Sequence, residues 1–181
     1  MSHPSIFIFT GTSGSGRKTI ARKVGDELSW TAVRSCTTRA PRNPAQSDGD
    51  YHYVSREQFD HWDNDGLFAQ TADIDGNRYG VLRRELEDAL ARGQSVYLVL
   101  NRAGADAIMK HYGDRAVRIF IYVDKTTMRE RLESKGTSYE VVEHYLDHYS
   151  EEVTYRSKCE HVFENVNVAR TAELIRAALA R

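Results

Sequence analysis

A short apolar run followed at once by a glycine-rich loop constrains this chain more than any other feature. Residues 6–9 read IFIF, and the stretch TGTSGSGRKTIARKV follows shortly after them. Gly11 and Gly16 have the spacing of the loop G-x-x-x-x-G-K-[S/T], in which backbone N–H groups surround phosphate oxygens. A strand that leads through such a loop into a helix predicts an anion site. The loop residues expected there are Gly11, Gly14, Gly16, Arg17, Lys18 and Thr19.

Two side chains of this loop differ from the usual pattern. Arg17 stands at the lysine position, and Lys18 stands at the position of the hydroxyl that binds Mg²⁺. Arginine keeps the positive charge of lysine but not its geometry. Alternatively, Lys18 and Thr19 act as the lysine and hydroxyl pair in a loop with one extra residue. The loop therefore predicts phosphate binding and leaves phosphate transfer open.

The rest of the chain alternates between strand and helix patterns. Apolar runs at residues 96–100 and 117–123 are typical of strands buried in a parallel sheet. Segments with an apolar residue every four positions, a capping box or an amphipathic pattern predict helices at residues 20–28, 82–90 (ending at Gly93), from Thr127 onward and 172–179. This alternation predicts an α/β fold with helices on both faces of the sheet and ligands beyond the carboxyl ends of its strands.

Composition limits the remaining possibilities. The 181 residues carry 25 basic and 26 acidic side chains and a formal net charge of −1, which gives no bias toward nucleic acid or a membrane surface. Cys36 and Cys159 match neither a disulfide framework nor a zinc spacing. No apolar run approaches the roughly 18 residues of a membrane span. We therefore expect one cytoplasmic domain.

Three motifs further along the chain are more specific. SCTTRAPR places Arg39 and Arg42 on either side of a proline, so that two guanidinium groups can converge on one phosphate. DYHYVS and GNRYG follow and contribute Tyr51 and Tyr79. In this order and at these separations, the motifs resemble those of the guanylate kinases. The resemblance extends from Ile6 to the last predicted helix.

The resemblance implies a P-loop NTPase-type parallel sheet flanked by helices, with an inserted lobe for a nucleoside monophosphate (NMP) and a lid. The expected core is residues 1–33, 85–124 and 154–181, the NMP lobe is 34–84, and the lid is 125–153. ATP is the implied phosphoryl donor and GMP the acceptor. The positions that hold the GMP phosphate in the family match Arg39, Arg42, Tyr51 and Tyr79, and a base contact matches Ser35.

The chain differs from the family at three positions that contact guanine. Gln70 replaces a glutamate, Asn101 replaces an aspartate, and Val81 replaces a residue with a hydroxyl group. An unpaired buried polar atom costs roughly 1–3 kcal/mol, so these changes argue against strict guanine selectivity. Amides donate as well as accept, and they can read another base, or guanine in another way. Asp73 and Asp75 are alternative base contacts, although we interpret them as an acidic turn.

The ATP side differs from the family as well. Val99 stands where the family has an acidic residue, so both usual anchors of Mg²⁺ are replaced, this one and the hydroxyl at Lys18. In the lid, Arg131 matches a family arginine that closes over the transferred phosphoryl group. Lys135 and Tyr145 replace two others. We interpret Tyr145 as a packing residue, because it lies on an apolar helix stripe.

Two functions fit these observations. The first is a guanylate-kinase-like NMP kinase that transfers phosphate from ATP to GMP or a related NMP, with weak turnover or altered base choice. Its candidate catalytic residues are Arg17, Lys18 and Arg131. The second is an inactive module that binds a nucleotide or a phosphorylated protein, since the loop also resembles the kinase-like domains of membrane-associated guanylate kinase scaffolds. A sugar phosphate is a third candidate acceptor.

One histidine pair has a spacing that also occurs in metal sites. His144 and His148 are four residues apart on a predicted helix, with acidic residues near the same face. No HExxH motif surrounds them, and we interpret them as part of a solvated face. The sequence therefore predicts no metal held by a dedicated set of side chains.

Overall fold

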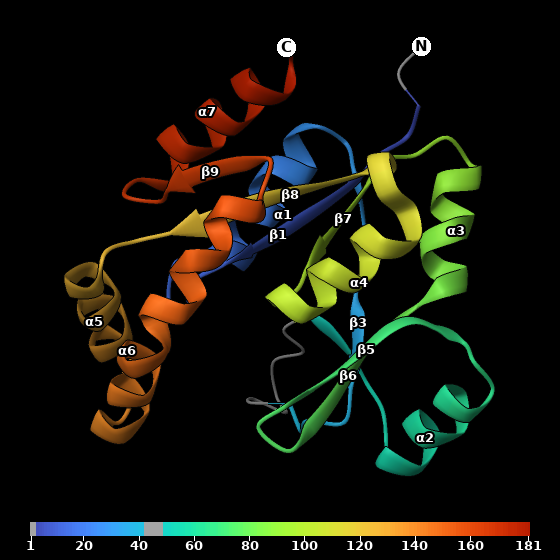
Figure 1. The fold of residues 1–181 in the computed structure, drawn as a ribbon, viewed down its shortest axis with the longest axis horizontal. Helices are drawn as coiled ribbons and strands as arrows, with labels where there is room; N and C mark the ends of the chain where they lie inside the picture. Colours follow the sequence, from blue (N-terminus) through green and yellow to red (C-terminus); the bar gives the residue numbers. More distant parts are fainter. Residues whose placement is uncertain (1–2, 42–48) are drawn as a thin grey trace.

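The computed structural model describes residues 3–41 and 49–181, and Arg42 lies outside these ranges. The described chain forms two sheets (Figure 1). The larger has five parallel strands in the order β2-β7-β1-β8-β9, and the smaller has four strands in the order β4-β3-β6-β5. The strands are β1 (Ile6–Gly11), β2 (Thr31–Ala32), β3 (Ser35–Thr37), β4 (Tyr51–Tyr53), β5 (Phe68–Ile74), β6 (Asn77–Leu82), β7 (Val96–Val99), β8 (Ala116–Tyr122) and β9 (His161–Glu164).

Helices cover both faces of the large sheet (Figure 1). The α-helices are α1 (Arg17–Glu27), α2 (Arg56–Asn64), α3 (Arg83–Ala91), α4 (Arg102–Tyr112), α5 (Lys125–Ser134), α6 (Tyr139–Thr154) and α7 (Val168–Leu179); η1 (Gly113–Arg115) and η2 (Tyr155–Lys158) are short 3₁₀ helices. None of the helices in residues 3–41 and 49–181 is both long and apolar enough to cross a membrane.

The continuous apolar run of β1 is explained by burial on both sides. Successive side chains of a strand point to opposite faces. Ile6 and Ile8 belong to a core cluster with residues of α3 and α4, whereas Phe9 belongs to a second cluster with residues of α1 and α7. Both faces of the strand are therefore apolar, and the expected α/β fold with a buried parallel sheet is confirmed.

The small sheet has its own core and lies below the large sheet in the view of Figure 1, to the right of α5 and α6. Phe59 of α2 stacks on Phe68 of β5 with ring centres 4.4 Å apart, next to buried Cys36. The β5–β6 hairpin turns at Asp75 (φ 50°) and Gly76 (φ 78°). The interpretation as an acidic turn is confirmed for Asp75, whereas Asp73 lies in β5 and forms an ion pair with Arg78 at 3.3 Å.

Some element boundaries differ from the sequence prediction. The predicted start of a helix at Thr127 is wrong: α5 begins at Lys125, because the Asp124 carboxylate accepts a hydrogen bond from the Thr127 N–H at 2.7 Å. Leu28 lies outside α1 and is exposed. The final helix starts at Val168, four residues earlier than predicted, since Asn167 caps it.

The segments around α5 and α6 pack largely on each other. Tyr145 contacts the small cluster of Val142 and Met128, so its interpretation as a packing residue is confirmed. His144 and His148 are exposed, and the Nδ1 atom of His148 lies 2.7 Å from the His144 carbonyl oxygen. The solvated face predicted for this pair is also confirmed.

Candidate functional site

The glycine loop joins β1 to α1 in a conformation that favours glycine. Gly11, Gly14 and Gly16 have φ angles of 145°, 71° and 82°. A Cβ atom on Gly11 would lie 1.8 Å from the carbonyl oxygen of Ile121 in β8. Because α1 begins at Arg17, its first unpaired N–H groups follow the loop directly. This is the backbone geometry of an anion site.

Two side chains from later parts of the sequence form hydrogen bonds with the Ser15 carbonyl oxygen of the loop. Asn165, which is 1% exposed, donates its Nδ2 hydrogen to the Ser15 carbonyl oxygen at 2.8 Å. The guanidinium of Arg131 donates to the Asn165 carbonyl oxygen at 2.6 Å and to Ser15 O at 3.4 Å. Arg131 thus lies beside the loop, and Asn165 is a supporting residue that no sequence motif marks.

The side chain of Glu152 lies near the loop, as does that of Arg17. The Nη1 atom of Arg17 donates to the Gly11 carbonyl oxygen at 3.4 Å. Burial lowers the pKa of Arg17, and the negative charge of Glu152 opposes this shift. Glu152, on α6, accepts hydrogen bonds from the Ser13 N–H at 2.8 Å and from the Ser13 hydroxyl at 3.0 Å. No sequence motif marks Glu152, because only the fold brings α6 to the loop.

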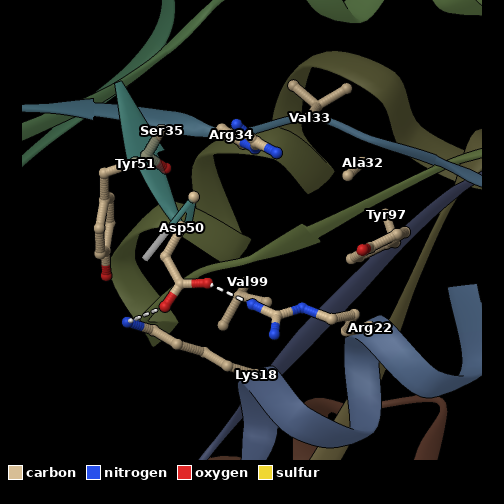
Figure 2. Close-up of a pocket in the computed structure, with 11 residues that line it drawn as sticks. Lys18, Arg22, Ala32, Val33, Arg34, Ser35, Asp50, Tyr51, Tyr97 and Val99 are labelled. Atoms are coloured by element: carbon tan, nitrogen blue, oxygen red, sulfur yellow. Dashed lines mark hydrogen bonds and ion pairs between the residues drawn. The ribbon is translucent and has the colours of Figure 1, made fainter. Parts of the chain in front are cut away.

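Lys18 points away from the loop toward the small sheet (Figure 2). Its Nζ atom is 3.7 Å from Asp50 Oδ2 and 4.5 Å from the ring centre of Tyr51. Arg22, about one turn further along α1, donates to Asp50 Oδ1 at 2.8 Å. Two cationic side chains of α1 therefore pair with Asp50, just before β4. The ammonium group of Lys18 lies near the predicted acceptor residues rather than in the loop.

Further side chains of the small sheet gather around the Tyr51 ring. Tyr51 and Tyr79 have ring centres 5.7 Å apart, and the Arg39 guanidinium carbon is 5.3 Å from the Tyr51 ring centre. The backbone N–H of Arg39 donates to Thr37 Oγ1 at 3.1 Å, which orders the chain where it leaves β3. Arg39, Lys18 and two phenols thus come from separate elements to one place, an arrangement suited to a phosphate group.

The three predicted base contacts that differ from the family come from β5, β6 and the start of α4. Gln70 and Val81 are directly paired across β5 and β6, just after an irregularity in the register. Asn101 caps α4, since its Oδ1 accepts a hydrogen bond from the Gly104 N–H at 2.8 Å. A Cβ atom on Gly104 would lie 3.3 Å from Asn101 Oδ1 and 3.5 Å from Gln70 Nε2. The two amides are therefore close neighbours.

A pocket of about 210 Å³ opens between α1, β7 and the small sheet (Figure 2). Its wall includes Lys18, Ser35, Tyr51 and Val99 from the predicted set, together with Asp50. Gln70, Val81 and Asn101 do not line it. The pocket therefore joins the glycine-loop helix to part of the predicted acceptor site.

A parallel sheet with a glycine loop between β1 and α1, facing a cationic and aromatic cluster on an inserted sheet, defines a P-loop nucleotide-binding protein. Comparison with known proteins gives the family. The family model of guanylate kinase matches residues 3–180, and the chain therefore belongs to the guanylate kinase family.

Individual relatives agree with this assignment. A guanylate kinase of Rubrobacter xylanophilus is 34% identical over 175 residues, covering 94% of this chain and 91% of the relative. A guanylate kinase of Fusobacterium nucleatum is 30% identical and covers 91% of this chain and 90% of the relative. The crystal structure of guanylate kinase from Anaplasma phagocytophilum has a TM-score of 0.78 at 27% identity, covering 99% of this chain and 86% of that chain.

Proposed function

We propose that this protein transfers a phosphoryl group from ATP to a nucleoside monophosphate, with low turnover and altered base choice. The observation that carries the proposal is the meeting of Arg39, Tyr51 and Tyr79 with Lys18 in one place. Guanidinium and phenol groups hold a phosphomonoester through charge-assisted hydrogen bonds. Membership of the guanylate kinase family supports the same reaction class.

The loop side fits the phosphates of ATP. Positive φ angles at Gly14 and Gly16 leave the backbone open to an anion, and Arg17 adds a cation above the loop. Arg131 lies close enough to the loop to contact Ser15. In the proposed reaction, the loop binds the donor phosphates and Arg131 stabilises the charge on the transferred group. ATP itself supplies the phosphoryl group.

The chain's own side chains do not fit the usual Mg²⁺ site. Mg²⁺ prefers oxygen ligands, yet Lys18 and Val99 stand where the family has a hydroxyl and a carboxylate. Within residues 3–41 and 49–181, no group of three or more His, Cys, Asp and Glu side chains is placed to hold a metal ion. We therefore propose that the chain's own contribution to charge stabilisation comes from its cationic side chains, and that low turnover follows from the replaced anchors.

Lys18 has a different role in this proposal from that of the hydroxyl it replaces. The Lys18 Nζ atom is 4.5 Å from the centre of the Tyr51 ring, and the Arg39 guanidinium carbon is 5.3 Å from it. A phosphate bound to the Tyr51 hydroxyl would therefore lie near both cations. Lys18 then binds the acceptor phosphate rather than the donor. Its ion pair with Asp50 holds the ammonium in place before the acceptor binds.

A second candidate function is a binding module that has lost phosphoryl transfer. The observation in its favour is Glu152, whose carboxylate accepts two hydrogen bonds from Ser13 and places negative charge beside Arg17. A negative charge at this place opposes the phosphates of ATP. Such a module would keep the Arg39 and Tyr51 cluster to hold a nucleotide or a phosphorylated protein.

An assay of ADP formation separates the two candidates. ATP would be combined with AMP, GMP, CMP, UMP or the deoxy forms, with and without Mg²⁺. Turnover of about 1 s⁻¹ or more on any acceptor, the lower end of the usual kinase range, would exclude the inactive module. Binding of an NMP without formation of ADP above the rate of ATP hydrolysis would instead favour the module.

A variant pair tests the acceptor site itself. Arg39→Ala should abolish binding of whichever NMP the wild type holds, as measured by calorimetry. Arg56→Ala is the matched control, because Arg56 is an exposed arginine on the same part of the chain. Equal affinity of wild type and Arg39→Ala would show that the phosphate site lies elsewhere.

A further inference from the structure

Three side chains of the pocket between α1, β7 and the small sheet have no part in the proposed reaction. Arg22 of α1, Arg34 just before β3 and Tyr97 of β7 line it, and none of them belongs to the glycine loop or to the predicted acceptor residues. In Figure 2, Arg22 and Arg34 lie on opposite sides of this space, and the Tyr97 hydroxyl points into it. The pocket therefore contains polar groups without an assigned role.

The wall of this pocket is positively charged. The described residues that line it include three cations and one carboxylate, namely Lys18, Arg22, Arg34 and Asp50. Asp50 pairs with Lys18 at 3.7 Å and with Arg22 at 2.8 Å. The Arg34 guanidinium forms no ion pair with any described residue, and only its backbone N–H is engaged, by a Glu85 carboxylate oxygen at 3.4 Å. The wall thus carries more positive charge than Asp50 balances.

Two hydroxyl groups in the wall are free to donate. Ser35 is 7% exposed, and its Oγ atom, unlike that of Ser15, keeps some accessible surface and has no hydrogen-bond partner among residues 3–41 and 49–181. The Tyr97 hydroxyl has no such partner in the same ranges. Burial raises the pKa of Tyr97, so this hydroxyl is protonated at neutral pH. Buried polar groups are nearly always paired, so an unpaired one that faces a cavity points to a ligand.

A phosphate group matches this wall better than a carboxylate does. The planar fork of arginine binds two oxygens of one anion, and hydroxyl groups add further donors. A phosphate group offers three acceptor oxygens and about 1.5 to 2 negative charges at neutral pH, whereas a carboxylate has two oxygens and one charge. The pocket volume of about 210 Å³ is below the roughly 300–1,000 Å³ of pockets for drug-sized ligands. The occupant is therefore a small anionic group rather than a whole nucleoside.

We propose that this pocket binds a phosphate group between its two arginines and against the free hydroxyls of Ser35 and Tyr97. This anion site goes beyond the proposed kinase function and does not depend on it. Lys18 and Tyr51 line the pocket and also belong to the proposed acceptor site. The phosphate group therefore has two possible sources, a separate small ligand or an acceptor that carries a second phosphate.

Inorganic phosphate tests the site without any nucleotide. It would be titrated into the ¹⁵N-labelled full chain at pH 7 and constant ionic strength, and the amide signals would be followed by NMR. The amides of residues 32–35 and 97 report on the pocket, whereas those of Gly14 and Gly16 report on the glycine loop. We expect the pocket amides to shift and saturate. Acetate under the same conditions should leave them unchanged.

Two variants test which groups hold the anion. Arg34→Ala should weaken phosphate binding at the pocket amides by about tenfold or more, because it removes a charged donor. Tyr97→Phe keeps the ring that packs against Gly25 and removes a neutral donor, so it should weaken binding by about two- to tenfold. Arg56→Ala is the matched control, because Arg56 is exposed and does not line the pocket, and it should keep the wild-type Kd.

Nucleotides then identify the source of the phosphate group. A nucleoside 3′,5′-bisphosphate would be compared by calorimetry with the 5′-monophosphate of the same nucleoside. Binding of the bisphosphate that is tighter by about tenfold, with the gain lost in Arg34→Ala, assigns the pocket to a second phosphate of the acceptor. Equal affinities, with inorganic phosphate still shifting the pocket amides of the NMP-saturated protein, assign it to a separate ligand.

The outcomes decide the proposal. Saturable shifts of the pocket amides that weaken in Arg34→Ala support the site. No saturable shift there, equal shifts with acetate, or an unchanged Kd in Arg34→Ala overturns it. Failure of every NMP to bind would overturn the proposed kinase function alone, because the titration with inorganic phosphate does not involve it. If Arg34→Ala fails to fold by circular dichroism, Tyr97→Phe and the wild-type titrations still decide.

Discussion

Replacement of Lys18 by alanine tests whether this loop residue binds the phosphate of the acceptor. In the free protein, Lys18 contributes one ion pair to Asp50 at 3.7 Å and one cation–π contact to Tyr51 at 4.5 Å. Its side chain is 43% exposed, so the ion pair contributes about 0–1 kcal/mol. The cation–π contact adds about 0.5–1 kcal/mol. Lys18→Ala should therefore lower the free energy of unfolding by no more than about 2 kcal/mol.

The expected effect on the acceptor is larger. A hydrogen bond between a charged donor and a phosphate contributes about 1.5–3 kcal/mol, which corresponds to about 10- to 150-fold in Kd. Calorimetry with the NMP that the wild type binds most tightly would measure this loss. Lys23→Ala is the matched control, because Lys23 is a lysine of the same helix that pairs with Glu27.

The two measurements together can refute the assignment. If Lys18→Ala changes Kd by less than about twofold while Lys23→Ala behaves the same way, Lys18 does not bind the acceptor phosphate. A loss of stability without loss of affinity would identify Lys18 as a structural bridge between α1 and Asp50. If Lys18→Ala lowers the affinity for donor nucleotides alone, Lys18 binds the donor phosphates and not the acceptor.

Three further predictions concern the rest of the molecule. Burial raises the pKa of both Cys36 and Cys159 to about 12, so at pH 8 both thiols should react far more slowly with a disulfide reagent in the native protein than in urea. Burial raises the pKa of Glu160, but hydrogen bonds from Arg118 outweigh this and lower it below its usual value. The ionised Glu160 therefore adds to the free energy of unfolding above its unfolded pKa of about 4.3, and this stabilisation is lost as the pH falls through the lower pKa of the folded state. In urea denaturation, the wild type should be more stable than Glu160→Gln at pH 7, and the difference should shrink in acid. Gly11→Ala should lower the free energy of unfolding by more than about 1 kcal/mol, because the new Cβ would meet the β8 backbone; an unchanged melting temperature would contradict this.

The sequence by itself determined the fold class, the order of its parts and the family. Alternating apolar strands and amphipathic helices encode a parallel sheet through local periodicity, and glycine spacing encodes a loop with positive φ angles. Motifs such as SCTTRAPR and GNRYG are local in sequence, and their order carries the resemblance. The starts of two helices were predicted too late in the chain, because the residues that cap them are Asp124 and Asn167.

Only the tertiary structure decided which side chains meet. Lys18 reaches Asp50 because α1 lies beside the segment that leads into β4, and Glu152 reaches Ser13 because α6 packs next to the loop, 139 residues away in sequence. The amide orientation of Asn101 depends on the cap of α4, and the unpaired oxygen of Gln70 depends on burial between β5 and that helix. Hydrogen bonds and charges act over a few ångströms, so residues that sequence motifs leave separate acquire their roles only when the chain folds.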